Sequence, residues 1–355
     1  MTTSFSSTEF FLLESVIKIA VVLFVLLTAV AYLTWLERKV VGHIQSRWGP
    51  YRVGPHGLLQ PLADGLKFLF KEDIVPTEAD RVVYWLAPLL AFTLAFLSIS
   101  VIPFGGAFTL AGHTIALQIT DVNVGLLFVF AVTSLGVYSV ALAGWSSHSK
   151  YPLFGALRSS AQMISYEISL SLGVIGVLMI AGTLSLRQIV ERQAGLWSHA
   201  GVFSLLPRWN LFLQPLGFFI YFVAAIAETN RVPFDLPEGE TELVAGFHTE
   251  YSSFKFAMFF MSEYANMVTV SALATLLFIG GWLGPVFGPG WLRVLLPVFW
   301  FCLKVFCFLF FYIWVRGTLP RFRYDQLMAF GWKFLLPLAL LNILVTSLVV
   351  AWIRA

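Results

Sequence analysis

The sequence predicts an all-α integral membrane protein with about eight transmembrane helices. Hydrophobic residues make up 59% of the 355 positions and charged residues 12%, whereas a soluble domain carries about 25% charged residues. The mean hydropathy is +0.84. Eight apolar runs are close to the roughly 20 residues that a helix needs to cross the hydrocarbon core; they cover residues 17–35, 82–103, 122–145, 159–182, 211–227, 256–283, 294–315 and 334–353.

Positively charged residues gather in alternate connections between these runs. The first connection contains seven Lys and Arg residues, whereas residues 103–121 contain none. Short connections rich in Lys and Arg stay in the cytoplasm, so we expect the odd-numbered connections to be cytoplasmic and both termini to lie outside. The N-terminal segment lacks the basic region and the cleavage site of a signal peptide, so the first helix is expected to be retained.

No repeat and no shift in composition divides the chain. We therefore expect one polytopic domain over residues 1–355, with functional cytoplasmic loops at residues 37–81 and 228–255. Within the first loop, residues 58–70 place leucines at helical spacing opposite Asp64 and Lys67, which is typical of an interfacial amphipathic helix. Residues 183–197 show a weaker form of this pattern, for which a solvated face is an equal alternative.

The sequence lacks the residues that several functional classes need. All six histidines fall in loops or near the ends of the predicted helices, so a haem protein is disfavoured. The chain contains no Walker A loop, no dinucleotide fingerprint, no CxxC and no HExxH. We expect the chain itself to bind no metal and no redox cofactor, and the net charge of +3 gives no reason to invoke nucleic acid.

The most polar segment is AETNRVPFDLPEGETELVAGFHTEY, residues 227–251, which lies between two hydrophobic runs. It holds six of the nineteen acidic residues around one arginine, Arg231. Lipid solvates neither carboxylates nor irregular backbone. This loop must therefore sit in water or line a buried polar cavity, and it is the first candidate for function.

Ionisable residues also occur inside the predicted helices, at Glu167, Glu263 and Lys304. Each costs roughly 2.5 to 3.5 kcal/mol at a helix centre, which implies a partner or a water-filled cavity. Glu37 and Glu228 lie near the cytoplasmic ends of their helices. We expect these carboxylates to form a proton path. Of Glu228 and Glu263, the two nearest the loop, we expect Glu263 to lie deeper in the membrane. The alternative is that they only bond neighbouring helices together.

Four segments occur in order between residues 36 and 332: LERKVVGHIQSRWGPYRVGPHGLLQPLADGLKFLFKED, SKYPLFGALRSSAQMISYEIS, AETNRVPFDLPEGETELVAGFHTEYSSFKFAMFFMSEYANM and PRFRYDQLM. Together they resemble the quinone-site membrane component of respiratory complex I, the H subunit of the proton-pumping NADH:quinone oxidoreductase. The resemblance implies a fold of eight helices or a similar number. It also implies that the chain forms much of the quinone tunnel and a glutamate-lined path that couples quinone reduction to proton translocation.

The resemblance also implies site residues, partners and location. Quinone is the expected substrate, and the expected partners are the hydrophilic quinone-site and iron-sulfur subunits, small membrane subunits and lipid. The expected location is the bacterial inner membrane, or the mitochondrial inner membrane if the chain is organellar. Tunnel positions match Arg38, Arg47 and Arg231, and proton-path or coupling positions match Glu37, Glu167, Glu228, Asp235, Glu238, Glu240, Glu242, Glu250 and Glu263.

Three other functions remain open at this point. A component of a related energy-converting hydrogenase would share the buried carboxylates. An ion antiporter would share them too, but transporters of this size usually show two related halves, and the sequence shows no such symmetry. A pure anchor for soluble subunits would not need Glu167 or Glu263 inside its helices.

Overall fold

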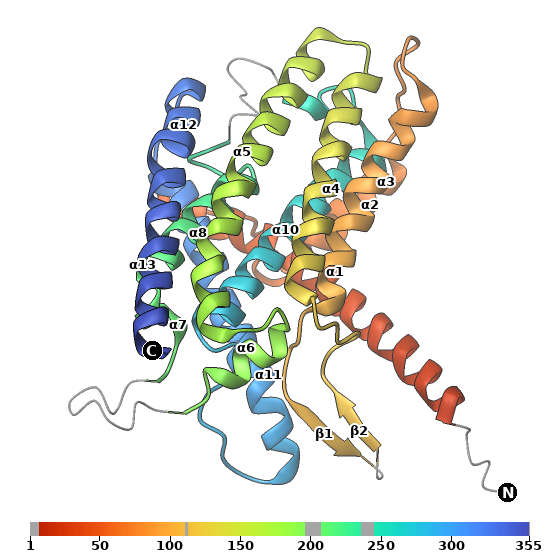
Figure 1. The fold of residues 1–355 in the computed structure, drawn as a ribbon. Coiled ribbons are helices and arrows are strands. Elements are labelled where there is room, and N and C mark those ends of the chain that lie inside the picture. The colour runs from red at the N-terminus through yellow and green to blue at the C-terminus, as the bar shows by residue number, and fades with distance from the viewer. Residues whose placement is uncertain (1–6, 111–112, 196–206, 236–244, 355) are drawn as a thin grey trace, which may run out of the picture.

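The computed structural model describes residues 7–110, 113–195, 207–235 and 245–354, and they form a bundle of long helices with one small β-hairpin (Figure 1). The all-α membrane fold is therefore confirmed. The long elements of the bundle are α1 (Ser7–Ile44), α3 (Arg81–Leu97), α4 (Gly125–Ser146), α5 (Lys150–Ala181), α8 (Pro215–Glu228), α10 (Ser253–Phe278), α11 (Gly290–Thr318) and α13 (Leu336–Arg354).

Shorter elements connect these helices. A π-helical turn, η5 (Gly331–Leu335), joins the short helix α12 (Tyr324–Phe330) to α13. The remaining short elements are η1 (Pro55–Gly57), α2 (Gln60–Phe70), η2 (Ser98–Val101), β1 (Ala107–Leu110), β2 (His113–Ala116), α6 (Leu186–Arg192), α7 (Asn210–Leu213) and η4 (Gly246–His248). The two strands pair antiparallel, with Phe108 opposite Ile115.

Six of the described helical segments are long and apolar enough to cross a membrane: Phe11–Ile44, Arg81–Val101, Gly125–Ser146, Lys150–Ala181, Gly290–Thr318 and Tyr324–Ile353. The other two predicted spans are less regular. α8 is apolar but has only 14 residues, and α10 has 26 residues but contains Lys255 and Glu263. The predicted number of about eight membrane helices is compatible with this arrangement.

The predicted run 211–227 is a broken helix. α7 ends at Leu213 and α8 begins at Pro215, with the intervening Gln214 at φ −132° and ψ 57°. A proline disfavours the helical conformation in the residue before it, which explains the break. The Gln214 side chain fills the gap by donating to the Thr346 hydroxyl at 2.9 Å and accepting from the Asn342 amide at 3.1 Å.

The connections near the two predicted functional loops meet at one end of the bundle. The Asp80 amide donates to the Ser146 carbonyl at 3.2 Å, and the Phe322 amide donates to the Pro233 carbonyl at 3.0 Å. The Tyr84 hydroxyl donates to the Glu250 carbonyl at 2.7 Å. We call this the loop end. In Figure 1 it lies at the top, and the hairpin and both chain termini lie lower.

Both amphipathic patterns form helices. The pattern at residues 58–70 becomes α2 at the loop end, as predicted. The weaker pattern becomes α6 on the opposite side of the bundle, where Leu186, Ile189 and Val190 are buried. The alternative of a solvated face is therefore wrong for α6, because its apolar side chains pack into the main hydrophobic core.

Lys304 has a structural role in this fold. Its ammonium group on α11 donates to the carbonyls of Ile279, Gly281 and Leu283 at 2.8, 2.9 and 2.7 Å. These carbonyls follow the C-terminus of α10, where backbone acceptors are left without helical partners. For Lys304 the structure therefore favours the alternative of a residue that bonds neighbouring helices.

Candidate functional site

Arg231 lies at the centre of a buried ion network beneath the loop end. It is 6% exposed, in the segment that follows α8. Its Nη1 lies 3.4 Å from Glu37 Oε1 on α1, and its Nε lies 2.7 Å from Glu263 Oε1 on α10. The guanidinium also lies 4.2 Å from the centre of the Tyr264 ring. A planar guanidinium suits this task because it can bind two carboxylates and stack on an aromatic ring together.

Glu37 joins three helices to this network. Its Oε2 accepts a hydrogen bond of 2.7 Å from the Tyr264 hydroxyl, and Arg316 of α11 pairs with its Oε1. Two carboxylates, Glu37 and Glu263, thus meet two guanidinium groups, Arg231 and Arg316. The balance matters because an unpaired charge buried in a protein is strongly unfavourable.

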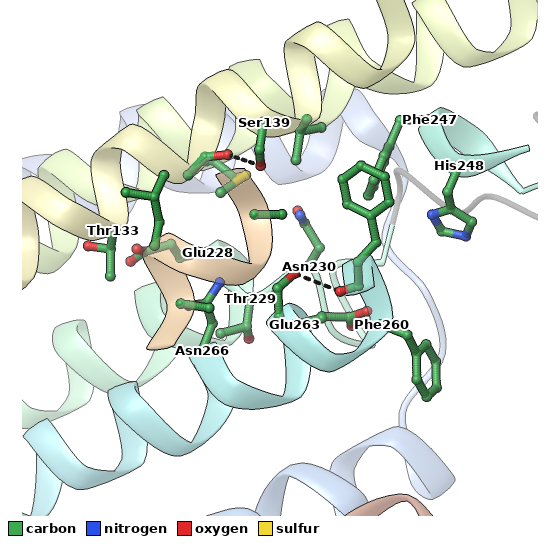
Figure 2. A pocket seen from close by; sticks show the side chains of 18 of the residues that line it. Thr133, Ser139, Glu228, Thr229, Asn230, Phe247, His248, Phe260, Glu263 and Asn266 are labelled. Carbon is green, nitrogen blue, oxygen red and sulfur yellow. Dashed lines mark hydrogen bonds between the residues drawn. The ribbon is translucent and has the colours of Figure 1, made fainter. Parts of the chain in front are cut away.

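A cavity of about 70 Å³ lies beside the network and has both Glu263 and Glu228 on its wall. Figure 2 shows Glu228, Thr133 and Asn266 at one end of this cavity and Phe247 and His248 at the other. A buried water needs about 10–15 Å³ and two to four polar partners. The cavity therefore has room for a few waters between the two glutamates.

Glu228 is the least satisfied of these carboxylates within the described part of the chain. Its Oε2 is buried and accepts no hydrogen bond there. A second cavity, of about 30 Å³, also has Glu228, Thr133 and Asn266 on its wall. Glu228 thus separates two small cavities, a position from which a carboxyl group can exchange hydrogen bonds with water on either side.

Glu167 is a further glutamate inside a helix, α5. It interacts electrostatically with Glu228, and Ser134 of α4 donates a hydrogen bond to its carboxylate. Counted from the starts of the predicted apolar runs 159–182 and 256–283, Glu167 and Glu263 would lie roughly 10 to 14 Å into their helices, but α5 begins at Lys150 and α10 at Ser253. At about 1.5 Å per residue, Glu167 lies about 26 Å from the start of its helix and Glu263 about 15 Å. Hydropathy located the apolar part of α5 but not its polar first turns.

The described part of the acidic loop is held tightly against the bundle. Gln162 of α5 donates through Nε2 to the carbonyls of Ala227 and Phe234, both at 2.8 Å. Asp235 is buried and pairs with Arg321 at 3.1 Å. The Phe234 ring stacks on Phe322 with centroids 5.4 Å apart. Segments far apart in the sequence therefore fix the position of Arg231.

Other predicted site residues lie outside this network. Arg38 is exposed and pairs with Asp64 of α2 at 2.7 Å, and Arg47 is exposed and donates through Nε to Gln45 Oε1 at 2.7 Å. Glu250 contributes its carbonyl to Tyr84. The predicted carboxylates Glu238, Glu240 and Glu242 lie outside the described residues.

The sequence reasoning missed several partners. Arg316, Lys255, Tyr264 and Ser134 were not singled out as site residues. Lys255 is 1% exposed and pairs with Asp73 at 2.9 Å, between the rings of Tyr84 and Trp85. One signal could have suggested Arg316, namely an arginine in the last turn of a spanning helix.

Among the described residues, no group of three or more His, Cys, Asp or Glu side chains is placed to hold a metal ion. The fold and the site together define a multi-pass helical membrane protein with an ion network centred on the buried residues Glu37 and Arg231, beside small cavities that have glutamates on their walls. Such networks inside membranes are typical of ion and proton pathways.

Comparison with known proteins identifies the family. The family model described as NADH dehydrogenase matches residues 17–347, and the chain belongs to this family. A Koribacter versatilis protein, named as an H subunit of NADH-quinone oxidoreductase, is 62% identical over 97% of this chain and 99% of its own length. Proteins named as the same kind of subunit from Solibacter usitatus and Thermomicrobium roseum are 53% and 54% identical, covering 96% and 94% of this chain and 98% and 94% of their own lengths.

The resemblance to the membrane component of complex I is thereby confirmed. The chain is a multi-pass subunit of an inner-membrane oxidoreductase of this family. The hydrogenase and antiporter alternatives are not favoured, since these relatives carry the NADH-quinone oxidoreductase name.

Proposed function

We propose that this chain forms a wall of the quinone site and transmits the charge change of quinone reduction to the buried glutamates. The path runs from the acidic loop through Arg231 and Glu263, across the 70 Å³ cavity to Glu228, and on to Glu167. Quinone is the substrate, and partner subunits carry the electrons. In this proposal the loops at residues 37–81 and 228–255 are the cytoplasmic, functional part of one polytopic domain.

The main support for the proposal is that the guanidinium of Arg231 is shared by two carboxylates, those of Glu37 and Glu263. Reduction of a quinone takes up two electrons and two protons, so the charge near the loop changes during turnover. Arg231 lies 2.7 Å from Glu263 and 3.4 Å from Glu37. A change of charge at the loop that draws Arg231 toward Glu37 would leave Glu263 to take a proton from water in the cavity.

Glu228 is the next group on this path. It lies on the wall of both cavities, and its Oε2 accepts no hydrogen bond within the described residues. A proton that reaches Glu228 can continue to Glu167, with which it interacts. This is a coupling mechanism in the thermodynamic sense, because it needs two arrangements of the network with different proton binding.

The tunnel assignment rests on the first loop. Arg47 adjoins a surface hollow of about 660 Å³ lined by Trp48, Gly49, Pro50, Tyr51, Arg52 and Gln60. Exposed aromatic and basic residues of this kind suit docking of the hydrophilic quinone-site subunit. The resemblance places Arg47 at the tunnel, and Trp48, Gly49 and Pro50 would still set the local backbone without its side chain. Replacement of Arg47 by Ala should therefore lower the rate of quinone reduction more than the amount of assembled complex.

The experiment that tests coupling is a pair of isosteric replacements in the assembled complex. Glu228→Gln and Glu263→Gln keep the shape and the hydrogen-bonding capacity but remove the titrating group. We expect normal assembly with proton pumping lowered at least about tenfold, since positioned acid–base groups contribute roughly 100- to 10,000-fold. The greater predicted depth of Glu263 favours a larger effect in Glu263→Gln. We nevertheless expect the larger effect in Glu228→Gln, because Glu228 Oε2 accepts no hydrogen bond within the described residues, whereas Glu263 lies 2.7 Å from Arg231.

A matched control is Glu191→Gln. Glu191 is exposed on α6 and pairs with Arg187 at 2.9 Å, far from the loop end. It should leave quinone reduction and pumping unchanged. If both Glu228→Gln and Glu263→Gln pumped like the parent, the path would have to run elsewhere, and the two glutamates would be helix-packing residues.

A further inference from the structure

The start of α10 holds the C-terminal end of α2, although 185 positions of the chain separate Ser253 from Phe68. The Ser253 hydroxyl is shared between the carbonyls of Phe68 and Lys71, both at 2.9 Å. The Ile74 amide donates to Ser252 Oγ, also at 2.9 Å. The last four carbonyls of a helix have no partner within it, so Ser253 supplies a donor that α2 cannot provide for itself.

Lys255 adds an ion pair to this contact. Its ammonium group lies 2.9 Å from Asp73 Oδ1, in the segment that follows α2. The rings of Tyr84 and Trp85 on α3 have their centres 4.5 and 4.3 Å from the same nitrogen. Aromatic faces attract a cation at such distances, and Asp73 balances its charge. Loss of Asp73 would leave a buried charge among rings, which is unfavourable.

The aromatic rings around Lys255 are themselves fixed to the end of the third loop. Tyr84 is buried, stacks on Tyr251 with centroids 4.1 Å apart, and donates to the Glu250 carbonyl at 2.7 Å. The hydroxyls of Tyr251 and Ser146, at the end of α4, lie 3.2 Å apart. The first loop, α3, α4 and the start of α10 therefore meet around Lys255.

The opposite end of α2 lies at the surface hollow of the first loop. Gln60, the first residue of α2, lines that hollow. Its amide donates to Asp64 Oδ1 at 2.8 Å, and Asp64 pairs with Arg38 of α1 at 2.7 Å. α2 has 11 residues, a length of about 16 Å at 1.5 Å per residue. It is thus a short strut that connects the wall of the hollow to the start of α10.

We propose that Lys255 is a positioning residue for quinone reduction. Its pair with Asp73 clasps α2 to α10 and so fixes the hollow beside Arg47 relative to the ion network. α10 also carries Glu263, about two turns after Lys255, so one rigid helix bears both the clasp and a member of the network. The inference rests on the proposed part of the first loop in the quinone site. Lys255 acts through α2 and α10, without contact to quinone.

The two members of the clasp differ in exposure, and this decides the choice of variants. The Lys255 side chain is 1% exposed, whereas that of Asp73 is 36% exposed. Asp73→Asn therefore weakens the clasp from its outer side and is the milder variant, which keeps the test decisive if Lys255→Gln assembles poorly. Lys255→Arg retains the charge and can stack on both rings, so it should behave like the parent.

The first test measures the clasp directly, by hydrogen–deuterium exchange of residues 64–70 in the assembled complex. In Lys255→Gln and Asp73→Asn these amides should exchange about tenfold faster, the factor that about 1.4 kcal/mol of lost local stability gives. The matched control is Lys333→Gln, the same change at an exposed lysine of η5, which should leave the exchange of α2 unchanged. Parent-like exchange in both clasp variants would overturn the proposal.

The second test separates positioning from mere stability. A pair that only stabilises the fold lowers the amount of complex, whereas displacement of the hollow also changes the kinetics of the complex that does assemble. Per assembled complex, Lys255→Gln and Asp73→Asn should raise the KM for quinone several-fold and change kcat less, which is the pattern of weakened binding. Lys255→Arg should restore the KM of the parent.

Two kinetic results would overturn the positioning role. One is faster exchange of α2 with an unchanged KM for quinone, and the other is failure of Lys255→Arg to restore a raised KM. The Arg47→Ala variant shows which proposal has failed. If Arg47→Ala also reduced quinone like the parent, the first loop would have no part in the quinone site. If only the clasp variants lacked an effect, the failure would belong to Lys255 alone.

Discussion

Arg231 holds two carboxylates from different helices, and this makes it the most sensitive residue of the site. Removing one partner from a buried ion pair is destabilising by about 3–5 kcal/mol, because the remaining charge is left without compensation. In Arg231→Gln, Glu263 loses its neighbour at 2.7 Å, while Glu37 retains Arg316. We therefore expect a lower melting temperature and less assembled complex.

The double replacement of Arg231 and Glu263 by Gln tests whether this loss comes from the unpaired charge. It removes one charge of each sign, so it should be less destabilising than the sum of the two single replacements. Thermal unfolding of the purified complex measures all three variants. Strict additivity would show that Arg231 and Glu263 contribute independently and that their short distance has no energetic consequence.

His248 predicts that the stability of the folded protein depends on pH. Burial lowers the pKa of His248 from 6.5 to about 4, because desolvation disfavours the charged imidazolium. Below pH 6.5 the unfolded chain takes up a proton that the folded chain does not bind until about pH 4. Proton uptake by His248 in the unfolded chain therefore leaves the free energy of unfolding unaffected above about pH 6.5 and lowers it progressively as the pH falls toward 4.

The test replaces the titrating ring by a similar aromatic one. His248 packs edge-on against Phe247 and Phe256 at centroid distances of 4.8 and 5.2 Å, so His248→Phe should preserve much of this packing. Thermal unfolding of the complex between about pH 7 and pH 4 should show a weaker loss of stability in the variant. An identical pH profile would mean that other groups set the acid sensitivity.

At the scale of elements, the contact between η4 and α5 positions the end of the acidic loop. A Cβ atom on Gly155 of α5 would lie 2.8 Å from Gly246 Cα and from the Phe247 nitrogen, which are backbone atoms and cannot move aside as a side chain can. Glycine is therefore needed at residue 155 for the close approach of the loop. Phe247 and His248, which follow directly, line the cavity beside Glu263.

Gly155→Ala should push η4 away from α5 at a cost of about 1–3 kcal/mol, as overpacking does elsewhere. We expect lower thermal stability and faster proteolysis after η4, together with reduced pumping. Gly65→Ala is the control, because a Cβ on Gly65 of α2 meets no atom within 4 Å and alanine favours a helix by up to about 1 kcal/mol. Equal behaviour of the two variants would contradict a close contact at Gly155.

At the scale of the whole molecule, the distribution of Lys and Arg predicts that the loop end faces the cytoplasm. Two exposed positions test this in a background with Cys302 and Cys307 replaced by Ala. Glu72→Cys lies at the loop end, and Gly290→Cys lies at the start of α11, at the opposite end. A membrane-impermeant maleimide added to intact cells should label the cysteine at 290 and leave that at 72 unlabelled. The reverse result would invert the membrane topology.

The sequence by itself determined the membrane class, most of the helices and the candidate carboxylates. These properties are local, because transfer of apolar side chains into lipid and of charged ones out of it depends on each segment alone. The two clearest departures are also explained by chemistry near the segment. Pro215 interrupts the run at Gln214, and polar first turns extend α5 back to Lys150, beyond its apolar part.

The tertiary structure decided which of the charged residues meet. Glu37 lies 194 positions from Arg231 and 227 positions from Tyr264 along the chain, and Arg316 comes from yet another helix. No periodicity or composition relates residues so far apart, because their distances depend on how the helices pack. Helix packing also decides the place of two residues that the sequence could not distinguish. Lys304, which the sequence grouped with the buried glutamates, binds backbone carbonyls, and Arg47 lies on the surface. Side-chain chemistry is set by the sequence, but the pairing of charges across helices follows from the packing of the bundle.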